Sequence, residues 1–425
     1  MRICTTYGSQ VPLKTESDMH EIRTDVFDDI TVSDRNTVLT LCGKDIDIIP
    51  EGFEGIVDVG NRDVVIPYRK IRSIHDFNKT PDSDEIVSLL SEGDQEISKG
   101  AFTASSFTDL HSIMSASGNL KRKHVILGMG EIGKITRIRQ SLLGNEFTFG
   151  YVGTPTAPGQ LSADELEKLG DDCAITGITG NPLSHSKSPA MHNAAFKAMG
   201  INGIYLMFES PDIEHLGDVM REYNIRGLNI TIPYKQSVMN QADSLSDAAE
   251  HIGAVNTVIN DNGKLTGDNT DHVGISYAFS GIELKGKNVL IMGTGGAARA
   301  AAYTFTKAEC NVSVSGRTDN HVNTICNDFG CEAYKGSAGK FDIVVNCTPV
   351  GLTDGEYPSD VSDLHSKQII FDMVYGRDTP LITKAKEKKC RLIDGSEMLI
   401  GQGAESFRLW FGKEPDHNVM RGAIR

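Results

Sequence analysis

Short apolar runs alternate with short polar or helical stretches over the first ~165 residues of the chain, which is the pattern of parallel βα units. A series of about eight parallel strands in sequence favours a closed (β/α)8 barrel. The predicted strands are residues 2–7, 21–26, 37–41, 55–59, 70–74, 96–102, 124–127 and 148–152.

This first region is short for such a barrel, which normally needs ~200 residues or more. One connection, residues 43–54, contains a proline and is too short for a full helix. We therefore expect a trimmed (β/α)8 barrel over residues 1–165, and an open α/β sheet is the alternative.

The rest of the chain has the pattern of a two-lobed α/β protein. A linker that contains two prolines, residues 154–160, leads into a helix over 162–169 that Ser162 is placed to cap. C-terminal helices, with 399–411 among them, are expected to fold back onto the first lobe. The expected domains are a substrate lobe over 173–280, a Rossmann lobe over 281–395 and the C-terminal helices over 396–425.

Composition and charge narrow the class of protein. The length of 425 residues suggests two or three domains, and 39% apolar with 23% charged residues is typical of a globular chain. The net charge of −15 argues against nucleic acid, whose phosphates favour a basic face. No apolar run reaches the ~18 residues of a membrane span, and no signal peptide precedes the first strand.

The cysteines point to a reducing compartment. The eight cysteines are scattered, and none forms a Cys-x-x-Cys pair that would indicate a zinc site. Free thiols in a cytoplasmic protein are the expected reading, with no metal and with small molecules as partners.

A glycine-rich turn after an apolar run marks a candidate nucleotide site. Residues 288–292 predict a central parallel strand, and the turn that follows has the Gly-x-Gly-x-x-Gly/Ala spacing. Glycines let the backbone approach a pyrophosphate, and amides at the helix start hold its charge. A purely structural tight turn is the alternative. The candidate cofactor-binding residues are Gly293, Gly295, Gly296, Ala297 and Ala298.

The end of the next strand favours NADP(H) over NAD(H). An NAD site would carry an acidic residue there, ~20 residues after the turn. This chain instead has Arg317, with Ser315 and Thr318 as hydroxyl donors. A guanidinium suits a 2′-phosphate. The alternative is an arginine that only covers the end of the sheet.

Lys235 and Asp271 form the ionisable pair of interest in the substrate lobe. Each follows a polar turn, and a lysine near a carboxylate in a closing cleft can relay a proton to a carbonyl that is being reduced. Taken singly, each is more commonly a solvated surface charge.

At this level of detail residues ~173–415 resemble shikimate dehydrogenase along their whole length. The motifs that carry the resemblance are 186–189 with 192–193, 229–235, 253–257, 269–271, the glycine turn, 346–351, 372–375 and 398–403. The resemblance implies that Ser186 and Ser188 bind the substrate carboxylate and that Lys235 with Asp271 moves the proton. It also implies that Thr231, Asn256, Asp271 and Gln402 hold ring hydroxyls and that Tyr375 lies near the substrate.

Lys99 is unusual for a strand residue. It lies on the same strand face as Ile97 and Ala101, so an inward position in the barrel would bury its amine. Burial is expected to lower its pKa and to make it nucleophilic. A strand-end lysine that reaches water is an equally good reading of this pattern.

Residues 1–165 resemble type I 3-dehydroquinate dehydratase. The segments are 21–25, 73–81, 130–137 and 156–160, in the order of that family. The resemblance implies that Lys99 forms a Schiff base with the substrate ketone and that His75 acts as base and then as acid. It further implies that Arg137 binds the carboxylate, that Thr156 and Gln160 belong to a closing loop, and that Glu21 and Arg23 line the pocket.

This region also departs from the family pattern. Cys42 stands where the family has a substrate-binding Arg, and Ile46 where it has the Glu that orients the catalytic His. Asp45 or Asp47 could substitute for that Glu, and Thr156 replaces a Ser.

The two implied reactions are consecutive, because dehydration of 3-dehydroquinate gives the 3-dehydroshikimate that the reductase converts to shikimate, and neither needs a metal. Two alternatives stay open: a dehydrogenase fused to a degenerate sensor or scaffold barrel, and a reductase that works mainly on quinate.

Overall fold

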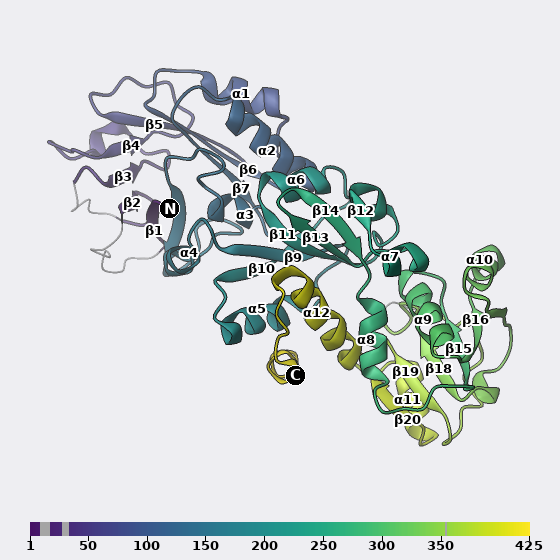
Figure 1. The fold of residues 1–425 in the computed structure, drawn as a ribbon. Helices are drawn as coiled ribbons and strands as arrows, with labels where there is room; N and C mark the ends of the chain where they lie inside the picture. The colour runs from purple at the N-terminus through teal and green to yellow at the C-terminus, as the bar shows by residue number, and fades with distance from the viewer. Residues whose placement is uncertain (9–17, 28–33, 353–354) are drawn as a thin grey trace. The chain divides into compact units, whose positions relative to one another are not determined.

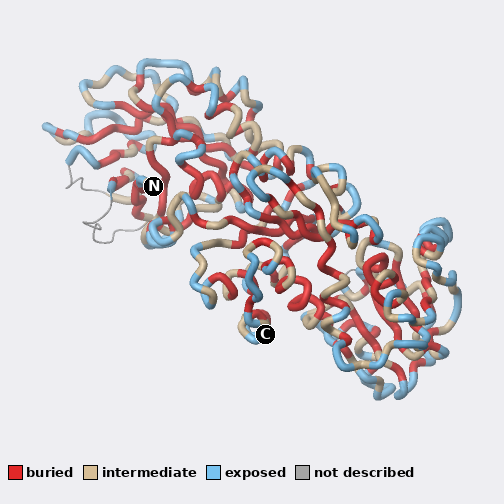
Figure 2. Tube along the Cα trace, in the orientation of Figure 1, coloured by how far each residue is buried: buried red, intermediate tan, exposed pale blue. Residues whose placement is uncertain are grey.

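The computed structural model describes residues 1–8, 18–27, 34–352 and 355–425. It divides into two compact units, one formed by Met1–Leu183 with Asn202–Arg226 and the other by Ser184–Ile201 with Gly227–Arg425. In each unit the buried segments are mainly strands and the helix faces that cover them (Figure 2). Among the described helices, none combines the length and the hydropathy that crossing a membrane requires.

The first unit contains an eight-stranded parallel sheet in the order β7-β6-β5-β4-β3-β2-β1-β8 (Figure 1). Every predicted strand is present, and β8 has the predicted bounds, whereas β2 begins two residues earlier than predicted. The strands are β1 Ile3–Tyr7, β2 Met19–Arg23, β3 Thr37–Thr40, β4 Ile56–Asp58, β5 Arg69–Asp76, β6 Ile97–Thr103, β7 His124–Met129 and β8 Thr148–Val152.

The sheet curls into a nearly closed barrel. β1 pairs in parallel with both β2 and β8, so only the β7–β8 side lacks a ladder. There the side-chain amide of Asn145 accepts from the Ile126 backbone amide (2.7 Å) and donates to the Ile126 carbonyl (2.9 Å). One side chain thus satisfies backbone groups that a closing strand would otherwise bind. The prediction of a trimmed barrel is confirmed.

Alternate residues of the strands fill the barrel with apolar side chains, including Cys4, Val38, Ile71, Val125 and Phe149. The covering helices are α1 Ser83–Ser91, α2 Phe107–Asn119, α3 Lys134–Ile138 and α4 Ala163–Leu169. Ser162 caps α4 through a capping box with Glu165, as predicted. The β3–β4 connection holds only a 3-10 turn, η1 Ile46–Ile48, in agreement with its short length.

The first unit continues beyond the barrel with β9 Ala174–Gly180, β10 Gly203–Glu209 and α6 Leu216–Glu222. Arg139, at the end of α3, donates to the backbone carbonyls of Asp171, Cys173 and Tyr223, among others. The Tyr223 hydroxyl donates to the Leu110 carbonyl in α2 (2.9 Å). These contacts bind the segment to the outside of the barrel.

The second unit contains two sheets. In the first, four strands lie in the order β11 Ile225–Ile230, β13 Thr257–Asp261, β14 Lys264–Asp268 and β12 Ser244–Leu245. The other is fully parallel in the order β17-β16-β15-β18-β19-β20, as the Rossmann prediction requires. Its strands are β15 Asn288–Met292, β16 Asn311–Ser315, β17 Glu332–Ala333, β18 Ile343–Asn346, β19 Ile369–Asp372 and β20 Arg391–Asp394.

The C-terminal helices pack on earlier helices of the second unit. α12 packs on α8 and α5, and α13 packs on α5. The helices of this unit are α5 Ser188–Met199, α7 Asp247–Ile252, α8 Asp271–Ala278, α9 Gly296–Lys307, α10 Asp319–Phe329, α11 Pro380–Glu387, α12 Gly395–Phe411 and α13 His417–Ala423.

Candidate active sites

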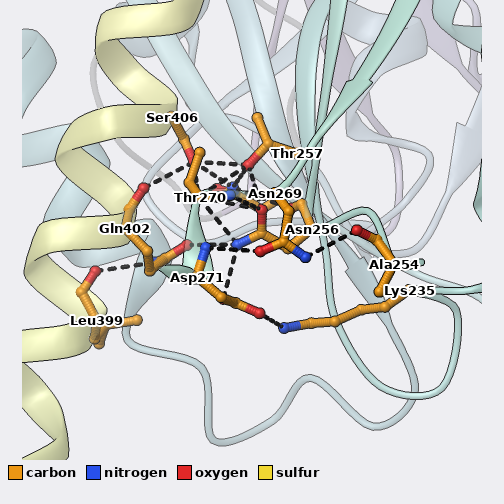
Figure 3. A network of polar contacts seen from close by, with 11 residues as sticks. Lys235, Ala254, Asn256, Thr257, Asn269, Thr270, Asp271, Leu399, Gln402 and Ser406 are labelled. Carbon is orange, nitrogen blue, oxygen red and sulfur yellow. Dashed lines mark hydrogen bonds and ion pairs between the residues drawn. The ribbon is translucent and has the colours of Figure 1, made fainter. Parts of the chain in front are cut away.

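A lysine–aspartate ion pair is the centre of the site in the second unit. Lys235 Nζ lies 2.5 Å from Asp271 Oδ2, and the lysine side chain is 15% exposed while the aspartate is buried (Figure 3). Lys235 comes from the turn after β11, and Asp271 begins α8. A pair that is shielded on most sides but open to a ligand can share and transfer a proton.

Amide side chains fix the aspartate in place. Asn256 Nδ2 donates to the second oxygen of Asp271 (2.8 Å), and the backbone amide of Asp271 donates to Asn269 Oδ1 (3.1 Å). Asn269 in turn donates to the Ala254 carbonyl (2.8 Å) (Figure 3). Thr257, Thr270 and Ser406 extend the same buried network. Because both carboxylate oxygens have a donor, Asp271 is held in one orientation as an acceptor.

The other residues predicted to bind the substrate differ in how they are connected to this pair. Gln402 Oε1 accepts from Asn256 Nδ2 (3.4 Å), and Thr231 begins the turn that leads to Lys235. Ser188 is the buried first residue of α5, and its amide donates to Ser186 Oγ (3.3 Å). Hydrogen bonds and the ion pair therefore join Asn256, Asp271, Lys235 and Gln402, whereas the two serines contact each other.

Tyr375 lines a cavity of about 240 Å³ together with Lys187. Lys187 lies between Ser186 and Ser188 in the sequence. Burial raises the pKa of the Tyr375 hydroxyl. Its predicted position near a substrate held by the serines is compatible with that shared cavity.

The glycine turn has the geometry that a dinucleotide requires. Gly293 has a φ of 128°, which L side chains rarely adopt, and a Cβ at Gly295 would meet nothing within 4 Å. A Cβ at Gly296 would lie 3.1 Å from Lys235 Cδ, so the turn closely approaches the ion pair. α9 begins at Gly296 without a side-chain cap, and buried Ala298 packs it on the sheet. Its first amides, Ala297 among them, are placed to bind phosphate.

At the end of β16 the three predicted residues differ in how accessible they are to a cofactor. Arg317 and Thr318 are exposed, and Arg317 has no ion-pair partner within the described residues. The Ser315 hydroxyl is buried and donates to the Pro358 carbonyl (3.0 Å). Arg317 is thus the better placed of the three to bind a 2′-phosphate, and the site as a whole fits NADP(H).

The site in the barrel is built around a buried lysine. Lys99 Nζ lies 3.2 Å from Asp58 Oδ2 and 4.0 Å from Glu21 Oε1. It also lies 4.3 Å from the centre of the Phe149 ring, a cation–π contact. These residues come from β6, β4, β2 and β8, and Asp58 is the last residue of its strand. Active sites of (β/α)8 barrels are formed at the carboxyl ends of the strands.

The expectation that burial lowers the pKa of Lys99 is wrong for this site. Burial does act in that direction, but the charges of Asp58 and Glu21 and the hydrogen bond to Asp58 raise the pKa above its usual value. Asp58 is itself anchored by the Ser73 hydroxyl (2.6 Å) and the Gly60 amide (2.9 Å). Lys99 is therefore stored as an ammonium ion and must lose a proton before it can act as a nucleophile.

His75 follows Ser73 on the same face of β5, and Ser73 is paired with Lys99 in the sheet. Burial and the positive charge of Lys99 lower the pKa of His75, although the residue is exposed at the mouth of the barrel. Its ring stacks on Phe77 and has no hydrogen-bond partner among the residues described. A neutral imidazole with a free ring nitrogen is the form that accepts a proton.

Arg137 carries a buried guanidinium that is incompletely paired. Its Nη1 donates to the Phe149 carbonyl at 3.5 Å, and its Nε has no partner in the described part of the chain. Burial lowers the pKa of Arg137 to about 10. Phe149 contacts both residues, with its carbonyl toward Arg137 and its ring toward Lys99, and the incompletely paired guanidinium suits an anionic ligand.

The remaining predicted residues are held by hydrogen bonds or ion pairs, and Glu21 is buried beside Lys99. The Gln160 side chain accepts from the Thr156 amide (2.8 Å), and Gly130 at the end of β7 donates to Pro158 in the same loop. Arg23 forms a two-point ion pair with Asp25 (2.7 and 3.1 Å). Glu21 accepts from the hydroxyls of Thr6 (2.5 Å) and Thr40 (2.7 Å), which fixes its orientation.

Neither Cys42 nor Ile46 supplies the charged group that the family has at its position. Cys42 is exposed and its thiol contacts Asp25 (3.2 Å), and Ile46 is 39% exposed in η1. Asp45 and Asp47 are exposed as well, and neither contacts His75. The substitution of Asp45 or Asp47 for the orienting Glu has no support from these contacts.

Asp58 is the functional candidate that sequence reasoning missed. It is fully buried beside Lys99, at the end of β4. The signal was available, because an acidic residue between two valines in a predicted strand is rarely buried without a partner. What the sequence could not show is which cation lies across the barrel from it.

Comparison with known proteins gives three family matches and close relatives of the second part. Residues 67–171 match the model for type I 3-dehydroquinase, residues 178–258 the shikimate dehydrogenase substrate binding domain, and residues 395–425 the shikimate 5′-dehydrogenase C-terminal domain. A shikimate dehydrogenase (NADP(+)) of Thermococcus kodakarensis is 40% identical over 261 residues, which is 59% of this chain and 95% of that protein.

Solved structures give the same result. The shikimate dehydrogenase of Aquifex aeolicus is 35% identical, with a TM-score of 0.56 over 60% of this chain and 98% of that one. The enzyme of Thermus thermophilus, solved in complex with NADP(H) and shikimate, is 36% identical, with a TM-score of 0.55 over 59% of this chain and 98% of its own.

Proposed function

This chain belongs to the shikimate dehydrogenase family and carries a type I 3-dehydroquinase domain, and from these two halves we propose that it catalyses consecutive reactions. The barrel dehydrates 3-dehydroquinate to 3-dehydroshikimate, and the second part reduces that product to shikimate with NADPH. The ligands are small molecules, and the net charge of −15 favours no nucleic-acid partner.

The Lys235–Asp271 pair is the observation that carries the reductase. NADPH, held by the glycine turn and Arg317, supplies the hydride. Lys235 donates a proton to the oxygen that becomes the new hydroxyl, and Asp271 orients the ammonium group and shares its charge. Asn256 donates a hydrogen bond to the second oxygen of Asp271, which holds the carboxylate in one orientation toward the lysine and the substrate.

Buried Lys99 beside Asp58 is the corresponding observation for the dehydratase. After loss of its proton, the Lys99 amine attacks the substrate ketone and expels its oxygen as water, which leaves an iminium ion. His75 then removes a proton from the adjacent carbon and returns it to the departing hydroxyl as water leaves. Hydrolysis frees 3-dehydroshikimate and restores the amine. Arg137 binds the substrate carboxylate during these steps.

The proposed location is the cytoplasm. All eight cysteines are free thiols, which suits a reducing compartment. Cell fractionation tests this, and recovery of the chain in an oxidising compartment with linked cysteines would contradict it.

Trapping of the iminium ion tests the dehydratase half directly. Borohydride added with 3-dehydroquinate should reduce the imine and attach substrate mass to the peptide that contains Lys99. The same treatment without substrate provides the background. If mass is never added to Lys99 and no 3-dehydroshikimate forms, the barrel is not a Schiff-base enzyme.

One alternative has specific support. Cys42, Ile46 and the unpaired ring of His75 favour a barrel that binds its ligand without turnover, as a sensor or scaffold for an active dehydrogenase. Under that reading the barrel should still bind 3-dehydroquinate, because the Arg137 guanidinium is incompletely paired, but the trapping experiment should give no adduct.

A further inference from the structure

A second group of ionisable side chains lies in the first unit, away from both candidate active sites. His111 comes from α2 on the barrel, Asp218 and Glu222 come from α6, and His215 directly precedes α6. The two helices pack side by side (Figure 1). No step of either proposed reaction uses these residues, so the group needs its own explanation.

The group brings metal-binding atoms together. His111, His215 and Asp218 each offer one ligand atom, and these atoms lie within 4.8 Å of one another. His111 Nδ1 lies 2.8 Å from Glu222 Oε1, which adds a second carboxylate. Two imidazoles with one or two carboxylates form a ligand set that Zn²⁺ and similar divalent transition metals prefer over Mg²⁺ or Ca²⁺.

Three of the four ligands come from α6 and from the residue before it. Asp218 and Glu222 are four residues apart in α6, so both project from the same side of that helix. His215 directly precedes α6, and its Nδ1 lies 3.1 Å from Asp218 Oδ2, which holds its ring toward the helix. Only His111 comes from a different part of the chain.

The backbone of His215 turns the chain into α6. Its φ is 58°, in the left-handed region, which His adopts more readily than most residues other than glycine. This turn places the His215 ring beside Asp218.

The rings of His111 and His215 lie face to face. Their centres are 4.3 Å apart and their planes differ by 6°. A neutral imidazole binds a metal through a lone pair that lies in the plane of its ring. Two stacked rings therefore do not both point at one ion, and binding requires one side chain to rotate while the helices stay in place.

The helices that carry the ligands are held rigidly. The Tyr223 hydroxyl, directly after Glu222, donates to the Leu110 carbonyl, directly before His111 (2.9 Å). Phe107 of α2 stacks on Phe208 of β10. Ligands on such a frame need little rearrangement to bind an ion.

We propose that His111, His215 and Asp218, with Glu222 as fourth ligand, form a binding site for a divalent transition metal that ties α2 to α6. The role is structural, since the ion would link the barrel to the first strands of the segment that follows it. This inference does not depend on either proposed reaction.

Zinc titration of the untagged full chain, stripped with a chelator, tests the proposal. We expect one equivalent of Zn²⁺ to bind with a Kd below ~10 μM at pH 7.5, with no comparable binding of Mg²⁺. Zn²⁺ should also raise the Tm, because a ligand that binds only the folded state stabilises it. Co²⁺ in the site should give the visible absorption of a coordinated ion.

Variants distinguish this site from any other. His111→Gln and Asp218→Asn should each weaken Zn²⁺ binding by at least ~10-fold and remove the Co²⁺ signal. His321→Gln, which changes an exposed histidine in α10, should bind like the wild type. Unchanged reductase turnover in each variant would show that the chain is folded. No binding by the wild type, or unchanged binding by both ligand variants, would overturn the proposal.

Discussion

Both candidate active sites hold a lysine beside an aspartate, but the surroundings differ. Lys235 faces one carboxylate whose other oxygen is occupied by Asn256. Lys99 lies deeper, between two carboxylates and an aromatic ring. The first arrangement orients an ammonium group that donates a proton, whereas the second stores an ammonium group that must be deprotonated to form a bond. The same pair of residue types therefore supports two kinds of chemistry.

The two sites also differ in how many hydrogen-bond partners their catalytic residues have. In the reductase site, the aspartate and its amide partners form a continuous network. In the barrel site, His75 has no hydrogen-bond partner among the described residues, and Cys42 and Ile46 offer no group to replace the missing Arg and Glu. We therefore expect a fully efficient reductase joined to a dehydratase with a raised KM or a slowed turnover.

Lys99→Ala should have the largest effect, because it removes the nucleophile. Dehydration should fall below detection and borohydride should attach no substrate mass, while reduction of 3-dehydroshikimate continues. Lys235→Ala is the matched variant and should show the reverse pattern. Loss of both activities in either variant would mean that the two sites are not independent.

Lys235→Ala and Asp271→Asn should each reduce reductase turnover by at least ~100-fold, the scale of general acid–base catalysis. Lys264→Ala, an exposed lysine of β14, is the control and should leave turnover unchanged. Steady-state assays with 3-dehydroshikimate and NADPH measure the effect. Near-normal turnover in both variants would remove this pair from the mechanism.

Arg317→Ala should weaken NADPH binding by about tenfold or more and leave NADH almost unaffected, because a charged contact to a phosphate contributes roughly 1.5–3 kcal/mol. Lys285→Ala removes another exposed cation of the same unit and serves as the control. Fluorescence titration with both cofactors gives the comparison. An equal loss for both would show that Arg317 has a structural role.

Asp58→Asn should shift the pH profile of dehydration. Asp58 raises the pKa of Lys99, so the free amine becomes available only as pH rises, and kcat/KM should increase with pH on that limb. Loss of the charge should move the limb to lower pH by about one unit or more. Ser73→Ala keeps the charge but removes the hydrogen bond to Asp58, so its shift should be smaller. An unchanged profile in Asp58→Asn would mean that this carboxylate does not control Lys99.

Local patterns predicted the fold well. All eight barrel strands, the capping of α4 by Ser162 and the parallel strand before the glycine turn follow from alternation and capping, which are properties of neighbouring residues. The strand predicted over residues 21–26 is instead β2 Met19–Arg23, so it begins two residues earlier and ends three residues earlier than predicted. Directly after Arg23, the Thr24 hydroxyl donates to the Leu41 carbonyl and holds the chain in a turn.

Properties that depend on residues far apart in the sequence could not be predicted from local patterns. The direction of the Lys99 pKa was wrong because Asp58 and Glu21 reach it from other strands, and no local pattern places them there. The cluster of His111 with α6 was likewise invisible, since its two halves are about 100 residues apart in the sequence.

Product analysis of the complete reaction tests the central claim most directly. Purified chain, 3-dehydroquinate and NADPH are combined, and the products are identified by chromatography and mass spectrometry. The account predicts that shikimate appears and that NADPH is consumed in equal amount. If 3-dehydroquinate stays unchanged while added 3-dehydroshikimate is reduced, the barrel is not a dehydratase and the bifunctional account is contradicted.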